Sequence, residues 1–85
     1  MQLVVTLVAA DPHDLAAALE AVEIAVAGGG TLVGEADLLG PNAADLPVES
    51  AAPAVVREQA EAALAGRRVD VCVQPAAGRR KRLLI

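Results

Sequence analysis

Few side chains in this 85-residue sequence are of a type that does chemistry. There is one histidine, His13, which stands between Asp11 and Asp14 with no serine or cysteine near it. A surface histidine at the start of a helix is therefore a better interpretation than a general base. Cys72 has no second cysteine to pair with, and His13 and Cys72 are too few for a zinc site. We predict no catalytic residue and no metal ligand, and Cys72 as a small apolar filler.

The acidic pairs and the glycine run have structural explanations. Glu20 with Glu23, and Glu58 with Glu61, are three positions apart, so each pair shares one helix face that water can solvate. The three glycines at residues 28–30 follow a helical segment instead of opening one, which argues against a phosphate-binding loop. We expect them to end the helix with a left-handed residue.

Charge is divided unevenly along the chain. Residues 1–66 carry a net charge of −9 and residues 67–85 a net charge of +5, which together give the overall −4. The four consecutive bases at residues 79–82 could bind phosphate. The chain has no aromatic residue to stack on bases, and its acidic part would repel nucleic acid, so we expect no nucleic-acid partner.

The length fits one domain, since two separate cores need roughly 100 residues or more. No apolar run is long enough for a membrane span and the start lacks a signal peptide, so we expect a cytoplasmic protein with no membrane partner. The core has no aromatic side chain and must be filled by Val, Leu and Ala. Such a thin core gains from contact with another domain or a second copy, so a homodimer is one expectation.

Hydrophobic spacing predicts six elements. Strands are expected at residues 2–9, at 31–36 or as far as 39, at 43–48 and at 69–74, and helices from Pro12 to the glycine run and from Pro53 to Gly66. Because proline donates no hydrogen bond, we expect the third strand to end or bulge near Pro47. The predicted inward-facing helix positions are Leu15, Leu19, Val22, Val26, Val56, Ala60 and Leu64.

The order β-α-β-β-α-β is the ferredoxin-like pattern. It predicts an α+β domain with a four-stranded antiparallel sheet and both helices on one face. The first strand is apolar on both sides and should be central. We expect Val4, Val8 and Cys72 on the sheet face without helices and Ile24 on the bare outer side of the first helix, two surfaces on which association would rest.

The C-terminal third resembles a known family. Residues 69–75 read VDVCVQP and residues 79–85 read RRKRLLI. A strand, a basic linker and an apolar run in this order resemble the junction of bacterial phosphoserine phosphatases, where an ACT-like domain precedes a haloacid dehalogenase-like catalytic domain. The resemblance implies an ACT-like domain at residues 1–74, a basic linker at 75–82 and the start of the first catalytic strand at 83–85. The catalytic Asp-x-Asp motif would follow Ile85 directly.

This resemblance implies a non-catalytic regulatory or assembly domain, whose partner is the C-terminal catalytic domain of the same protein. The full-length enzyme would hydrolyse O-phospho-L-serine to L-serine and phosphate in serine biosynthesis, with Mg2+ and through an aspartyl-phosphate. No catalytic or metal-binding residue, and no cofactor, would belong to the 85-residue chain. The alternative is a free-standing ferredoxin-like module that binds a small ligand or a protein.

ACT domains also bind an amino acid at an Asp-x-x-Gly-Leu-like turn after the first strand. Here the turn reads Asp11-Pro12-His13-Asp14-Leu15. The resemblance therefore makes Asp11, His13 and Asp14 candidate ligand-binding residues for an amino acid. The chain departs from the pattern where Asp14 replaces the glycine, because a carboxylate there repels the carboxylate of an amino acid.

Overall fold

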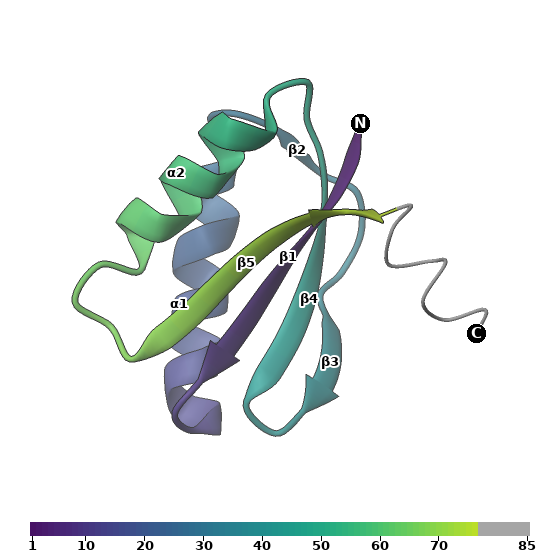
Figure 1. Cartoon of the computed structure of the whole chain (residues 1–85). Helices are drawn as coiled ribbons and strands as arrows, with labels where there is room; N and C mark the ends of the chain where they lie inside the picture. The colour runs from purple at the N-terminus through teal and green to yellow at the C-terminus, as the bar shows by residue number, and fades with distance from the viewer. Residues whose placement is uncertain (77–85) are drawn as a thin grey trace.

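The computed structural model describes residues 1–76, so the predicted apolar run at 83–85 and most of the predicted linker lie outside the described residues. A sheet of five strands forms one layer, and two helices cover one of its faces (Figure 1). The α+β class, the antiparallel pairing and the helices on one face are confirmed. The elements are β1 (Gln2–Ala9), α1 (Pro12–Val26), β2 (Thr31–Leu32), β3 (Asp37–Gly40), β4 (Ala43–Glu49), α2 (Pro53–Ala63) and β5 (Val69–Pro75).

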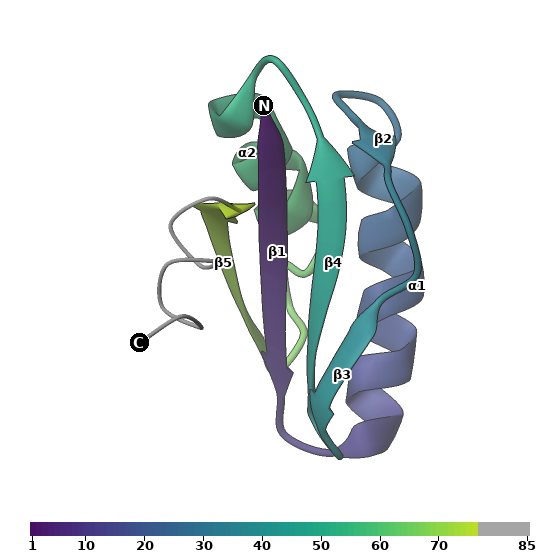
Figure 2. The same ribbon diagram turned by 90° about the vertical axis from the view of Figure 1, so that its right-hand side faces the viewer.

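β1 occupies the centre of the sheet, as predicted. It pairs antiparallel with β4 on one side and with β5 on the other, while β2 and β3 both pair with the far edge of β4 (Figure 2). Leu3, Val5 and Leu7 point from β1 toward the helices and are almost completely buried. The strand order is compatible with the ferredoxin-like pattern.

The second predicted strand is in fact two short strands, so the sheet has five strands and not four. β2 pairs with the end of β4 and β3 pairs with its beginning, and the ladder is interrupted between them. The interruption lies beside Pro47. Val33 donates a backbone hydrogen bond of 3.1 Å to the Pro47 carbonyl, but proline has no N–H to return the second bond of the pair.

β4 itself runs through Pro47 to Glu49 and stays paired with β1. The prediction that this strand ends or bulges near Pro47 is therefore wrong. The register shift in this part of the sheet lies between Leu38 and Gly40, where β3 meets β4. The sheet tolerates proline at this position because its nitrogen, which carries no hydrogen, points toward the interrupted edge of β4. The continuous ladder between β4 and β1 therefore loses no hydrogen bond.

α1 begins as its sequence predicts but ends differently. The Asp11 carboxylate accepts a hydrogen bond of 2.8 Å from the Asp14 backbone N–H, which caps the helix. At the other end Ala27 is right-handed, and within residues 1–76 the only glycine with positive φ is Gly66, at +81° after α2. The predicted left-handed glycine cap of α1 is therefore wrong, whereas the glycine end of α2 is confirmed.

The glycines after α1 allow the backbone at the end of this helix to approach β4 closely. A Cβ on Gly30 would lie 2.9 Å from the carbonyl oxygen of Glu49 and 2.9 Å from Cγ1 of Val48. Those distances are shorter than real Cβ contacts, so the absence of a side chain lets the end of α1 lie close against the end of β4.

The core lies between the sheet and the two helices. All seven predicted inward-facing helix residues contribute to it: six are buried, and Leu19 is half-buried and packs against them. The valines at residues 69, 71 and 73 of β5 are half-buried on the same side, as their alternation predicts. Neither helix of the described part of the chain is long and apolar enough to cross a membrane.

Candidate functional site

The turn between β1 and α1 lies next to the loop between α2 and β5. This follows from the antiparallel pairing, which places Ala9 at the end of β1 opposite Val69 at the start of β5. The Ala10 backbone N–H donates a hydrogen bond of 3.2 Å to the Arg68 carbonyl oxygen and so connects the two segments. The first turn of α1 and the two arginines before β5 therefore lie at the same end of the molecule.

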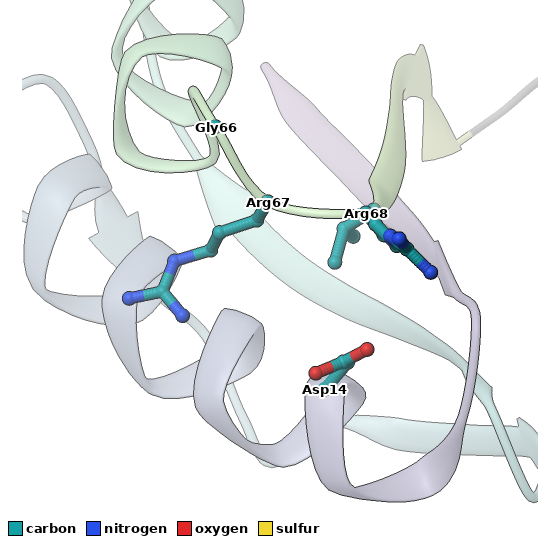
Figure 3. A pocket seen from close by; sticks show the side chains of 5 residues that line it. Asp14, Gly66, Arg67 and Arg68 are labelled. Carbon is teal, nitrogen blue, oxygen red and sulfur yellow. The ribbon is translucent and has the colours of Figure 1, made fainter.

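An open depression of about 360 Å3 lies between these segments (Figure 3). Asp14 points from the first turn of α1 toward the loop that carries Arg67 and Arg68 (Figure 3). A second depression of about 360 Å3 shares both arginines and Val69 and extends along the end of β1. The lining of the first is completed by Gly66 and Val69.

Charge in this site is mixed. Arg67, Arg68 and Asp14 line the first depression, and the N-terminus of α1 adds partial positive charge. The two arginine side chains point away from each other (Figure 3), and Arg67 also lines a separate depression with Glu20 and Ile24 of α1. The ion pairs among residues 1–76 join the Met1 ammonium to Glu49, at 2.7 Å, and Arg57 to Glu61, at 3.9 Å, so none of them involves Asp14 or the two site arginines. An arrangement of this kind is complementary to a zwitterion, with a carboxylate toward the arginines and an ammonium toward Asp14.

The three candidate ligand residues have different positions. Asp11 uses its carboxylate to cap α1. His13 is exposed and lines neither of the two depressions. Asp14 lines the first depression. The structure therefore brings one of the three, Asp14, into a potential binding site.

Sequence reasoning did not single out Arg67 and Arg68. The predicted element order could have pointed to them. In a β-α-β-β-α-β domain the last strand runs antiparallel to the first, so the residues just before the last strand lie beside the turn between the first strand and the first helix. A pair of arginines between Gly66 and the last strand is therefore placed at the end of the domain that holds Asp14.

Cys72 and the acidic side chains do not form a reactive centre in the part of the chain that the structure describes. Cys72 is exposed on the sheet face without helices, so it fills no core and that prediction is wrong. The Gln74 amide donates a hydrogen bond of 3.4 Å to its sulfur. Among residues 1–76, no group of three or more His, Cys, Asp or Glu side chains could hold a metal ion.

No family model, curated protein or solved structure matches this chain. Its own residues must therefore carry a functional assignment.

Proposed function

We propose that this chain is the non-catalytic, ACT-like N-terminal domain of a bacterial phosphoserine phosphatase, with a regulatory or assembly role. The full-length enzyme would hydrolyse O-phospho-L-serine to L-serine and phosphate. The strand order is the main support: β1 lies between β4 and β5 with both helices on one face, as a ferredoxin-like ACT domain requires. The sequence VDVCVQP forms the last strand, and three residues later comes the basic run that resembles the family's interdomain linker.

Magnesium would belong to the catalytic domain of that enzyme. Residues 1–76 offer no cluster of three or more His, Cys, Asp or Glu that suits a metal, so we assign no magnesium ligand to them. A contribution of this domain to catalysis would therefore act through its contact with the catalytic domain.

The codons that follow Ile85 test this proposal directly. We expect an Asp-x-Asp motif at once after Ile85. The product of the longer reading frame should release phosphate from O-phospho-L-serine in the presence of Mg2+, and the 85-residue chain should not. A frame that continues without this motif would refute the family assignment. Turnover by the 85-residue chain that survives replacement of His13 and Asp14 would show a catalytic site elsewhere.

A second candidate function, binding of a free amino acid, is favoured by the depression beside Asp14. Taken alone, Asp14 repels the carboxylate of an amino acid. Arg67 and Arg68 line the same depression and bring the opposite charge to it. The ligand would place its carboxylate against the arginines and its ammonium group against Asp14.

Calorimetric titration of the 85-residue chain with L-serine tests this second function. Arg67→Gln and Arg68→Gln should each weaken binding at least about tenfold, because a hydrogen bond to a charged group contributes about 1.5–3 kcal/mol. Arg57→Gln is the matched control, because Arg57 lies on α2 beside Glu61 and away from the depression. The amino-acid function is excluded if L-serine does not bind, or if all three variants bind it equally.

A further inference from the structure

The sheet face without helices, called here the open face, is turned toward the viewer in Figure 2. The strand pairing arranges its residues in rows across the strands. The pairing registers define three of them: an apolar row with Val4 at its centre, an acidic row with Thr6 at its centre, and a mixed row with Val8 at its centre. From β4 to β5 the apolar row reads Pro47, Val4, Gln74; the acidic row Asp45, Thr6, Cys72, with Asp37 of β3 beyond Asp45; and the mixed row Ala43, Val8, Asp70.

The apolar row borders a small depression of about 110 Å3. Val4, Pro47 and Val33 line it, and so does Ala76, the last residue that the structure describes. Ala76 therefore brings the end of β5 to the open face, at the apolar row. Whatever follows Ala76 starts from this point.

The open face is acidic. Asp37 and Asp70 are exposed on it, and Asp45 accepts a hydrogen bond of 2.7 Å from the Thr6 hydroxyl. Among residues 1–76 the arginines are at positions 57, 67 and 68, in α2 and in the loop before β5, so no arginine or lysine of this part belongs to the rows. The Met1 ammonium group is paired with Glu49 at 2.7 Å. Arg67 and Arg68 border the mixed row at its end, because they line one depression together with Val8 and Asp70.

The acidic character of the open face distinguishes between two segments that could cover it, a second copy of the chain and the residues that follow Ala76. A second copy placed face to face would bring one acidic row near another, and like charges in contact disfavour such a complex. The segment that follows Ala76 has the opposite character, with four bases at residues 79–82 and an apolar run at 83–85. We propose that the basic run at residues 79–82 binds the open face of its own chain, across the acidic and mixed rows.

The chain is long enough for this contact. Val4 and Val8 are four residues apart along β1, which is about 13 Å at roughly 3.3 Å per residue. Six residues, 77–82, span up to about 20 Å when extended. Starting beside Val4, the basic run therefore reaches the carboxylates of Asp37 and Asp70. This contact does not require a catalytic domain. If a catalytic domain follows residue 85, the contact would fix the direction in which the chain leads from the ACT-like domain to it.

Backbone 15N relaxation of the whole 85-residue chain tests the proposal. In about 0.01 M salt, where the Debye length is about 30 Å, we expect order parameters above roughly 0.6 for residues 79–82. The double variant Asp37→Asn/Asp70→Asn should lower them below that value, as should about 1 M salt. Glu58→Gln/Glu61→Gln is the control with the same charge change on α2, and it should leave them unchanged.

Chemical shifts locate the contact independently. Replacing the four bases at residues 79–82 by glutamine should shift the amides of Thr6, Val8 and Cys72 and leave those of Ala16 and Ile24, on the outer side of α1, in place. Low order parameters under all conditions would overturn the proposal, and so would shifts confined to the α1 side. Effects that disappear on dilution would show binding to another copy, which also overturns it.

Discussion

Gly30 offers a sharp test of how the end of α1 meets the sheet. In Gly30→Ala the new Cβ would lie 2.9 Å from the Glu49 carbonyl oxygen, 2.9 Å from Val48 Cγ1 and 3.2 Å from Ser50 Cβ. Val48 is fully buried and the oxygen belongs to the backbone of β4, so neither can move aside cheaply. The methyl group must therefore displace the end of α1 from β4.

The size of the effect follows from two opposing contributions. Forcing an extra methyl group into a packed site costs about 1–3 kcal/mol. Replacing glycine by alanine restricts the unfolded chain and returns about 0.4–1 kcal/mol. The expected net loss is about 1–2 kcal/mol in the free energy of unfolding, which in a domain of this size lowers Tm by about 5–15 °C.

Gly28→Ala is the matched control, two residues away on the same segment. Its Cβ would meet the Gln59 amide nitrogen at 3.3 Å, at the far end of a flexible side chain. Gly28 has no positive φ, so alanine fits its backbone and should leave stability unchanged or raise it by up to about 1 kcal/mol. Urea unfolding followed by circular dichroism measures both variants. If Gly30→Ala is as stable as Gly28→Ala, the close approach of α1 to β4 is wrong.

Three further predictions concern the core, the helix cap and the outer surface. Leu7→Ala should lower the free energy of unfolding by about 2–5 kcal/mol, because Leu7 is completely buried; Leu38→Ala, at a residue 67% exposed, should change it by less than about 0.5 kcal/mol in the same urea titration. Asp11→Ala removes the α1 cap and should cost about 1 kcal/mol by thermal unfolding, whereas His13→Ala should be neutral. Ile24→Gln should reduce self-association in sedimentation experiments if the exposed side of α1 forms a dimer contact, and an unchanged distribution would exclude that surface.

Much of the fold could be predicted because the relevant information is local. The alternation of residues 69–74 and the helical spacing of Leu15, Val22 and Val26 each follow from one segment, and the structure places these side chains toward the core. The split of the predicted strand at residues 31–39 could not be found this way. Its cause is Pro47, which lies in the neighbouring strand and denies the second bond to Val33. A break in a ladder depends on both strands.

The three glycines at residues 28–30 also show that a local sequence pattern does not reveal contacts between separate elements. Three glycines after a helix favour a left-handed cap when only the local chain is considered. The structure uses Gly30 for the close approach of a backbone carbonyl that comes from residue 49, nineteen positions later. Contacts of this kind depend on the packing of separate elements, and no local pattern encodes them.

The position of β5 determines which basic residues lie near each candidate site. A count of charges along the sequence does not show this. Residues 67–85 form a single basic block in the sequence. β5 divides it, because its antiparallel pairing with β1 puts its first residue opposite Ala9 and its last opposite Leu3, at the two ends of the sheet. Arg67 and Arg68 therefore lie with Asp14, whereas Ala76, which precedes the bases at residues 79–82 in the sequence, lies beside the apolar row of the open face. One block of charge can thus serve two separate surfaces, a small-ligand depression and a sheet face.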